Sequence, residues 1–288
     1  MLNKHPIEKK PFHFRRSMYF SEIHKTAIIH PTAQIGSGCE IGPHVYIGPE
    51  VEIGENNIIH RNVDIAGWTK IGNNNKIYSY AALGGDPQDR TYCGETTQLS
   101  IGDDNIIREF ATISRGTTKG GGITLIGDHN MFMAYSHVAH DCVIGSHVTL
   151  VNSANLAGHV QAQDYCFIGG LVAIHQHVII GRLAIIGLNA SVARDVPPFT
   201  MAAGNRATLR GINIIGLRRN GYSQASINTL RKAYPILFRQ RHKLSDCIER
   251  LKMMDLYKDD VIIKLTHFLS ASQRGYLRHN KNSDSDRD

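Results

Sequence analysis

An aliphatic residue stands at every sixth position over most of the first two hundred residues. Ten successive positions carry Ile or Leu: Ile29, Ile35, Ile41, Ile47, Ile53, Ile59, Ile65, Ile71, Ile77 and Leu83. After a lapse the pattern returns in phase at Ile101, Ile107 and Ile113, then shifts by one residue and runs from Ile126 to Val192. A helix repeats its apolar residues at three and four, and a half-buried strand at two. Neither element alone explains a pure period of six.

A period of six is typical of a solenoid whose repeating unit is a short strand followed by a turn. One branched aliphatic side chain per unit then points into a shared core. Gly often follows that side chain, as at Gly36, Gly42, Gly48 and Gly54, and Gly tolerates the backbone angles that turns demand. The pattern predicts a mainly β protein with a β-helix domain at residues 26–204.

Two Gly-rich polar stretches, residues 84–100 and 117–124, interrupt the repeat, and we expect the solenoid to extrude both as loops. The repeat ends before the breaker Asp195-Val196-Pro197-Pro198. Apolar residues then recur at three and four, which predicts a smaller α-helical domain at residues 205–275. Its expected helices are Ser223–Phe238, Ser245–Leu256 and Lys258–Ser270, the first with Ser223 as its N-cap.

The two ends of the chain lack the repeat. Residues 1–25 are predicted to be a flexible extension, and the polar residues 276–288 a disordered tail. No run reaches the roughly 18–20 apolar residues of a membrane span, and the N-terminus has no continuous apolar segment typical of a secretory signal. The five cysteines form no CxxC pair, which favours reduced thiols in a cytoplasmic protein.

The net charge of +7 is distributed unevenly. Residues 1–25 carry six basic and two acidic side chains, residues 26–204 carry nine and fifteen, and residues 205–288 carry seventeen and eight. A basic terminal region suits an acidic partner such as nucleic acid, an anionic membrane or an acidic carrier protein, or it is simply a solvated helix surface. The charge alone leaves these alternatives open.

The Ile-Gly-x-x-x-x pattern resembles that of the hexapeptide-repeat acyltransferases. This resemblance implies a left-handed parallel β-helix with three strands, and therefore about 18 residues, per coil. Residues 18 apart would then stack along one edge of a prism, with neighbouring coils about 4.8 Å apart. Three such columns contain most of the His residues of the second half: His140, Gly158 and Gln176; Asp141, His159 and His177; and Ala139, Ala157 and His175.

A neutral imidazole beside a carboxylate makes a good general base, because the carboxylate orients the ring and favours the imidazolium that forms. His140 and Asp141 supply this pair, and the amide of Gly158 would stabilise an oxyanion. These features predict acyl transfer to a hydroxyl. A zinc site made of three His from neighbouring coils is the rival interpretation, but Gln176 fits it poorly. We therefore predict no metal and no cofactor.

Several longer motifs sharpen the resemblance to the UDP-N-acetylglucosamine O-acyltransferases of lipid A biosynthesis. They are QDRTYCGE (88–95), TISRGT (112–117), HVAHDCVIG (137–145), LAGHV (156–160), IGGLVAIHQ (168–176), DVPPF (195–199), GNRAT (204–208) and GLRRNGYS (216–223). The resemblance implies transfer of an (R)-3-hydroxyacyl chain from acyl carrier protein to the sugar 3-hydroxyl. It also implies a homotrimer with active sites between subunits, with no nucleic acid as partner.

The resemblance assigns roles to individual residues. His140 would be the base, Asp141 its orienting partner and Gly158 the oxyanion donor. The substrate-binding residues would be Gln88, Asp89, His137, His159, His175, Gln176, Asn213 and Arg219. Leu188 stands where Gly occurs in relatives that take longer acyl chains, so its buried side chain would act as an acyl-length stop. Four positions depart from the family's usual residues, namely Thr91, Ser114, Arg206 and Asn220.

Two further interpretations remain. A catalytically silent scaffold or nucleotide-sugar binder would lack the base or its partner, whereas His140 and Asp141 are both present. A hexapeptide acetyltransferase that uses acetyl-CoA would usually have a shorter C-terminal region and no QDRTYCGE loop. The acyl donor that supports turnover distinguishes these possibilities.

Overall fold

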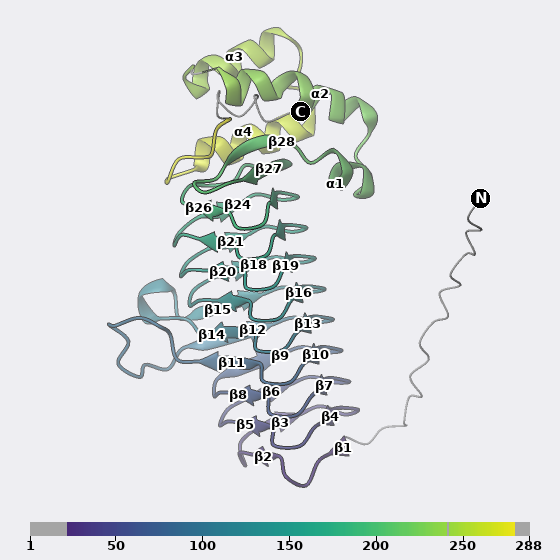
Figure 1. The fold of residues 1–288 in the computed structure, drawn as a ribbon, viewed down its shortest axis with the longest axis vertical. Helices are drawn as coiled ribbons and strands as arrows, with labels where there is room; N and C mark the ends of the chain where they lie inside the picture. The colour runs from purple at the N-terminus through teal and green to yellow at the C-terminus, as the bar shows by residue number, and fades with distance from the viewer. Residues whose placement is uncertain (1–21, 241, 280–288) are drawn as a thin grey trace, which may run out of the picture.

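The computed structural model describes residues 22–240 and 242–279 and shows a three-sided prism with a helical cap at its C-terminal end (Figure 1). The chain winds around the three sides, so each coil adds one strand to each of three sheets. The predicted parallel β-helix is confirmed, and the coils stack along the long axis of the molecule.

Three sheets form the sides of the prism, and we call them sheets A, B and C. Sheet A contains β1 Glu22–Ile23, β4 Glu40–Ile41, β7 Ile58–Ile59, β10 Lys76–Ile77, β13 Ile106–Ile107, β16 Met131–Phe132, β19 Thr149–Leu150, β22 Phe167–Ile168, β25 Ile185–Ile186, β27 Thr200–Ala203 and β28 Thr208–Ile212. Sheet B contains β2 Ile28–Ile29, β5 Tyr46–Ile47, β8 Asp64–Ile65, β11 Ala82–Gly85, β14 Thr112–Ser114, β17 His137–Val138, β20 Asn155–Leu156, β23 Ala173–Ile174 and β26 Ser191–Val192. Sheet C contains β3 Gln34–Ile35, β6 Glu52–Ile53, β9 Thr69–Ile71, β12 Gln98–Ile101, β15 Ile123–Ile126, β18 Val143–Ile144, β21 Gln161–Ala162 and β24 Ile179–Ile180.

The register of the sheets explains the six-residue period. Residues 18 apart face each other in neighbouring strands, as in the pairs Ile41 with Ile59 and Val138 with Leu156. In most of the two-residue strands the second side chain is buried, and it is the aliphatic residue of the repeat. Burial of one branched side chain per strand therefore builds the continuous core that the sequence predicts.

The turns differ from the prediction in one respect. The four glycines of the repeat, at positions 36, 42, 48 and 54, do not lie at positive φ, which is adopted instead by residues such as Asn62 (57°) and Asp141 (59°). The glycines are needed because neighbouring coils approach closely. A Cβ on Gly36 would lie 2.6 Å from the carbonyl carbon of Gly54. Their role is therefore steric rather than conformational.

Two loops leave the prism side by side (Figure 1). The first connects β11 to β12, and the second connects β14 to β15 and contains the 3-10 turn η1 Thr118–Gly120. The first lies within the predicted interruption at 84–100, whereas the second spans residues 115–122 and begins two residues before the predicted 117–124. The Nζ of Lys119 donates a hydrogen bond of 2.7 Å to the hydroxyl of Thr91, so the tips of the two loops touch.

Helices follow the last strand and cover the end of the prism. They are α1 Ile214–Arg219, α2 Gln224–Tyr234, the π-helical turn η2 Pro235–Arg239, α3 Leu244–Met253 and α4 Asp260–Ala271. The predicted N-cap is confirmed, because the Ser223 hydroxyl accepts a hydrogen bond of 3.0 Å from the Ser226 amide. Ile227, Leu251 and Ile262 are fully buried and join the helices to the core.

The domain boundaries differ from those predicted. Strand β1 at Glu22–Ile23 pairs with β4, so the first coil begins inside the expected extension 1–25; residues 1–21 lie outside the described residues. The disordered tail predicted from residue 276 is wrong for residues 276–279. Tyr276 and His279 pair with Asp195 and Leu209, and Leu277 is buried, because the chain returns to the end of the prism. Residues 280–288 lie outside the described part.

Across residues 22–240 and 242–279, no helix combines the length and the apolarity that crossing a bilayer requires.

Candidate active site

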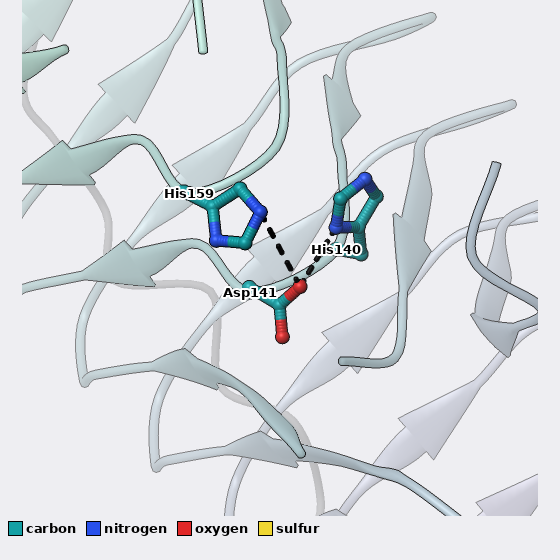
Figure 2. A group of neighbouring side chains, drawn as sticks. All are labelled: His140, Asp141 and His159. Atoms are coloured by element: carbon teal, nitrogen blue, oxygen red, sulfur yellow. Dashed lines mark hydrogen bonds and ion pairs between the residues drawn. The ribbon is translucent and has the colours of Figure 1, made fainter. Parts of the chain in front are cut away.

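The predicted base and its partner lie in the turn between β17 and β18, on the edge where sheet B meets sheet C. Gly158 and His159 occupy the equivalent turn of the next coil, between β20 and β21. Figure 2 shows the rings of His140 and His159 on two sides of the Asp141 carboxylate. The coil register therefore brings together the residues that the columns of the sequence predict.

His140 and Asp141 form a hydrogen-bonded pair. The Nδ1 of His140 lies 2.7 Å from Oδ2 of Asp141, and the side chains are 13% and 0% exposed. A carboxylate acceptor at Nδ1 holds the proton there, so Nε2 keeps the lone pair that a general base requires. The Nε2 of His159 lies 3.8 Å from the same carboxylate oxygen, beyond hydrogen-bond distance.

The Asp141 carboxylate is held by a residue that the sequence reasoning missed. Thr117 donates its amide to Oδ1 at 2.8 Å and its hydroxyl to Oδ2 at 2.7 Å. The Asp141 amide donates to the hydroxyl of Thr124 at 2.8 Å. The signal in the sequence was the motif TISRGT, which ends on Thr117 at the start of the second loop.

Gly158 leaves room for the ring of His140. A Cβ at this position would lie 2.5 Å from Cε1 and 2.8 Å from Nε2 of His140, so every other residue would collide with the imidazole. Within the described part of the chain, the Gly158 amide donates no backbone hydrogen bond. Both features fit the role predicted for Gly158.

Two neighbouring imidazoles are favoured in their neutral form. Burial lowers the pKa of His137, and the charge of His140 lowers it further. The ring of His137 shares a hydrogen bond of 2.7 Å with the Thr112 hydroxyl. Burial also lowers the pKa of His159, against the opposing effect of Asp141. Neutral rings are suited to hydrogen bonding with sugar hydroxyls.

The first loop carries Gln88 and Asp89, and Asp89 lies close to the His140 edge. The amide and hydroxyl of Thr91 hold the pKa of Asp89 below its ordinary value, and the charges of Lys119 and His140 act in the same direction. Asp89 is therefore favoured as an anion, within electrostatic reach of His140. Gln88 is exposed on the same loop, where a ligand can reach it.

Arg115 anchors this loop and was also missed by the sequence reasoning. Its buried guanidinium donates to Asp86, to the Tyr92 hydroxyl at 2.7 Å and to the carbonyl of Gly84 at 3.3 Å. The guanidinium also lies over the Trp68 ring, 5.5 Å from its centre. These contacts join both ends of the segment that contains Gln88 and Asp89 to the prism.

His175, Gln176 and Leu188 lie on the surface of the single chain. His175 and Gln176 are exposed beyond Gly158, one coil further along. Leu188 is 74% exposed, so the expectation that its side chain is buried is wrong for one chain alone. It lies in the turn after β25, on the edge between sheets A and B.

Asn213 and Arg219 lie on a different edge from His140. They line a cavity of about 690 Å³ between helix α1 and sheet A, together with His147, Tyr165 and Ile185. Asn213 is buried and caps α1, because its side chain accepts a hydrogen bond of 2.8 Å from the Gly216 amide. Its amide nitrogen also donates to the Leu183 carbonyl. Within one chain, the predicted nucleotide residues are not brought to the catalytic pair.

Metal binding is a possible use of the same cluster. Ligand atoms of His140, Asp141 and His159 all lie within 4.8 Å of one another. Both carboxylate oxygens of Asp141, however, already accept hydrogen bonds from Thr117 and His140. These donors compete with a cation for the carboxylate, so the contacts favour proton transfer, and we assign no metal ligands here.

Comparison with known proteins identifies the family that the chain resembles. The family model described as bacterial transferase hexapeptide repeats matches residues 20–53, 50–85 and 123–158. The model described as UDP-N-acetylglucosamine O-acyltransferase, domain 2, matches residues 195–277. The acyl-[acyl-carrier-protein]–UDP-N-acetylglucosamine O-acyltransferase of Thermodesulfovibrio yellowstonii is 50% identical over 258 residues, which cover 90% of this chain and all of that protein.

Solved structures extend the likeness to the fold. LpxA from Acinetobacter baumannii is 41% identical, with a TM-score of 0.86, and the match covers 89% of this chain and 99% of that one. The UDP-N-acetylglucosamine acyltransferase of Arabidopsis is 32% identical, with a TM-score of 0.78 over 89% of this chain and 100% of that one.

The left-handed parallel β-helix, its repeats and its helical cap thus define a hexapeptide-repeat transferase. More narrowly, the chain belongs to the family of acyl-[acyl-carrier-protein]–UDP-N-acetylglucosamine O-acyltransferases, an enzyme family.

Proposed function

We propose that this enzyme transfers an (R)-3-hydroxyacyl chain from acyl carrier protein to the 3-hydroxyl of UDP-N-acetylglucosamine, the first step of lipid A biosynthesis. The names of its relatives support the two substrates. The observation that carries the mechanism is the 2.7 Å contact between His140 Nδ1 and Asp141 Oδ2, which leaves the lone pair of Nε2 free to accept a proton.

The reaction follows from this pair. Nε2 of His140 takes the proton of the sugar hydroxyl as its oxygen attacks the thioester carbonyl carbon, and Asp141 stabilises the imidazolium. The new C–O bond leaves a tetrahedral oxyanion, to which the Gly158 amide donates. The C–S bond then breaks, and the imidazolium returns its proton to the thiolate of the carrier.

A trimer accounts for the separation of the site residues. Asn213 and Arg219 line a cavity on another edge of the prism, so the nucleotide bound there would present its sugar to His140 of a neighbouring copy. Arg219 is suited to the diphosphate because its guanidinium pairs with phosphate oxygens. Leu188, exposed in the single chain, would then be covered where the acyl chain lies.

The remaining roles follow from position and charge. Asp89, Gln88, His137, His159, His175 and Gln176 would surround the sugar and the acyl 3-hydroxyl. The acidic carrier protein would approach the basic region 205–288, which mainly accelerates its association. The five free cysteines support a reducing compartment, and we propose the cytoplasm.

A donor and acceptor assay with purified protein tests this function. We expect turnover with 3-hydroxyacyl carrier protein and UDP-N-acetylglucosamine, and a loss of about 10²–10⁴-fold in kcat for His140→Ala, the range that general bases supply. His44→Ala, an exposed His far from the site, is the control. Turnover with acetyl-CoA but not with the carrier thioester, or full activity of His140→Ala, would contradict the proposal.

The acyl-length role of Leu188 has its own test. Leu188→Gly should shift the preference toward longer chains, because it removes an isobutyl group from the proposed end of the acyl site. Rates across a series of carrier thioesters measure the shift. An unchanged preference would show that Leu188 does not set the length.

A further inference from the structure

Asp141 is contacted from both sides of the second loop. Near the start of the loop, Thr117 donates two hydrogen bonds to the carboxylate, one from its amide at 2.8 Å and one from its hydroxyl at 2.7 Å. In strand β15, just after the loop, the hydroxyl of Thr124 accepts the Asp141 amide at 2.8 Å. Asp141 adopts a left-handed conformation with φ of 59°, so contacts on both its backbone and its side chain keep a strained residue in place.

The hydroxyl of Thr117 has a fixed orientation. It accepts a hydrogen bond of 3.2 Å from the Gly120 amide, so its own proton points to Oδ2 of Asp141. That oxygen also accepts from His140. The side of Gly120 facing Asp141 has no spare room, because a Cβ there would lie 2.0 Å from the carboxylate carbon. The Asp141 side chain is completely shielded from water. Thr117 is therefore the hydroxyl that determines where the carboxylate can sit.

Other charged or titratable groups near His140 do not duplicate this contact. Apart from Asp141 itself, they are His137 of the same coil, His159 of the next coil, and Asp89 of the first loop. His159 remains 3.8 Å from Oδ2, and Asp89 is occupied by Thr91. Among the described residues, the side chains that hydrogen-bond to the Asp141 carboxylate are those of His140 and Thr117.

We propose that Thr117 is a positioning residue of the reaction, acting through Asp141 on His140. Its hydroxyl locks the carboxylate in the orientation that keeps the proton on Nδ1 of His140 and Nε2 free to accept the substrate proton. The second loop is thereby part of the catalytic apparatus. This inference rests on the proposed function of His140 as the base.

Thr117→Val removes the hydroxyl at nearly constant volume, and Thr117→Ser restores it. We expect Thr117→Val to lower kcat about tenfold to a hundredfold, the equivalent of one hydrogen bond to a charged group, with little change in KM. Loss of a donor to the anionic carboxylate increases the proton affinity of the pair. The acid limb of kcat/KM should therefore move to higher pH. Thr117→Ser should recover most of kcat and the wild-type pH profile.

Thr266→Val is the matched control. Thr266 is buried in helix α4, and its hydroxyl donates to the Ile262 carbonyl at 2.8 Å, far from the site along the chain. It reports the loss of a buried hydroxyl without an effect on catalysis. Thermal unfolding of all variants separates misfolding from mispositioning. If Thr117→Val does not fold, Gly120→Ala takes its place, because its methyl group would push the carboxylate away from His140.

The outcomes are distinct. The inference would be overturned if Thr117→Val kept the wild-type kcat and pH profile, or if Thr117→Ser were as impaired as Thr117→Val. In either case, a loss of activity in His140→Ala would still support the proposed function. An inactive wild-type protein, or an active His140→Ala, would contradict both. Selective loss of kcat that Ser rescues supports a positioning role.

Discussion

Single residues control the geometry around His140. Gly158 is the clearest case, since a methyl group added there would meet the imidazole at 2.5 Å. We expect Gly158→Ala to lower kcat on the order of a hundredfold, because a displacement of about 1 Å has that effect on a positioned group. Gly85→Ala, where a Cβ has nothing within 4 Å, is the control. Steady-state kinetics compare the two, and equal activity would exclude the steric role of Gly158.

The pH dependence of stability follows from His137. Its pKa in the folded protein is lowered by burial from the ordinary value of 6.5, so the unfolded chain binds this proton more readily. The free energy of unfolding should therefore decrease as the pH falls below about 6.5 through the lowered pKa. Unfolding measured from pH 8 to pH 5 should show a smaller decrease for His137→Gln than for the wild type. Parallel curves would show that His137 does not contribute.

At the scale of elements, a ladder of buried Asn residues stabilises the edge between sheets C and A. The side-chain oxygens of Asn57, Asn75 and Asn105 accept the amides of Asn75, Asn105 and Asn130 at 2.8–2.9 Å. Each Asn thus satisfies the backbone of the next coil. The side-chain oxygens thereby supply acceptors for corner amides that would otherwise be buried without a hydrogen-bond partner.

Asn105→Ala should lower the melting temperature, because the Asn130 amide would be left buried without a partner. Such a group costs about 1–3 kcal/mol. Asn155→Ala removes an exposed side chain whose amide bonds only to the carbonyl of Ser153, and it should have little effect. Thermal or urea unfolding tests the difference; similar losses in both variants would refute a role for the ladder.

At the scale of the whole molecule, the proposed catalytic pair, His140 and Asp141, and the proposed nucleotide residues, Asn213 and Arg219, lie on different edges of one prism. We expect sedimentation to give a mass about three times the 32.0 kDa of the chain. Mixed trimers of His140→Ala and Arg219→Ala chains should recover activity that neither variant shows alone, because some sites would combine an intact His140 with a neighbour's intact Arg219. A lack of complementation would indicate that each chain acts alone.

Arg115 holds the first loop against the prism through contacts that are distant in the sequence. Arg115 holds Asp86, Tyr92 and the Gly84 carbonyl from a buried position. Such an anchor affects the residues of the loop that follow it, including Asp89. The family motifs marked this loop as functional, but no periodicity pointed to its anchor.

The sequence by itself determined the solenoid, its core and the cluster around His140. In a coiled fold with three strands per coil, as the family resemblance implies, a separation of 18 residues becomes one step between neighbouring strands. The six-residue period and this resemblance together predict that His140 lies near Gly158 and Asp141 near His159. Only the tertiary structure decided how Thr117 and Arg115 engage the site, because loop insertions break the period and their contacts depend on non-local packing. It also decided that Leu188 is exposed and that Asn213 lies on another edge, since the distribution of residues among the three edges depends on how the coils close.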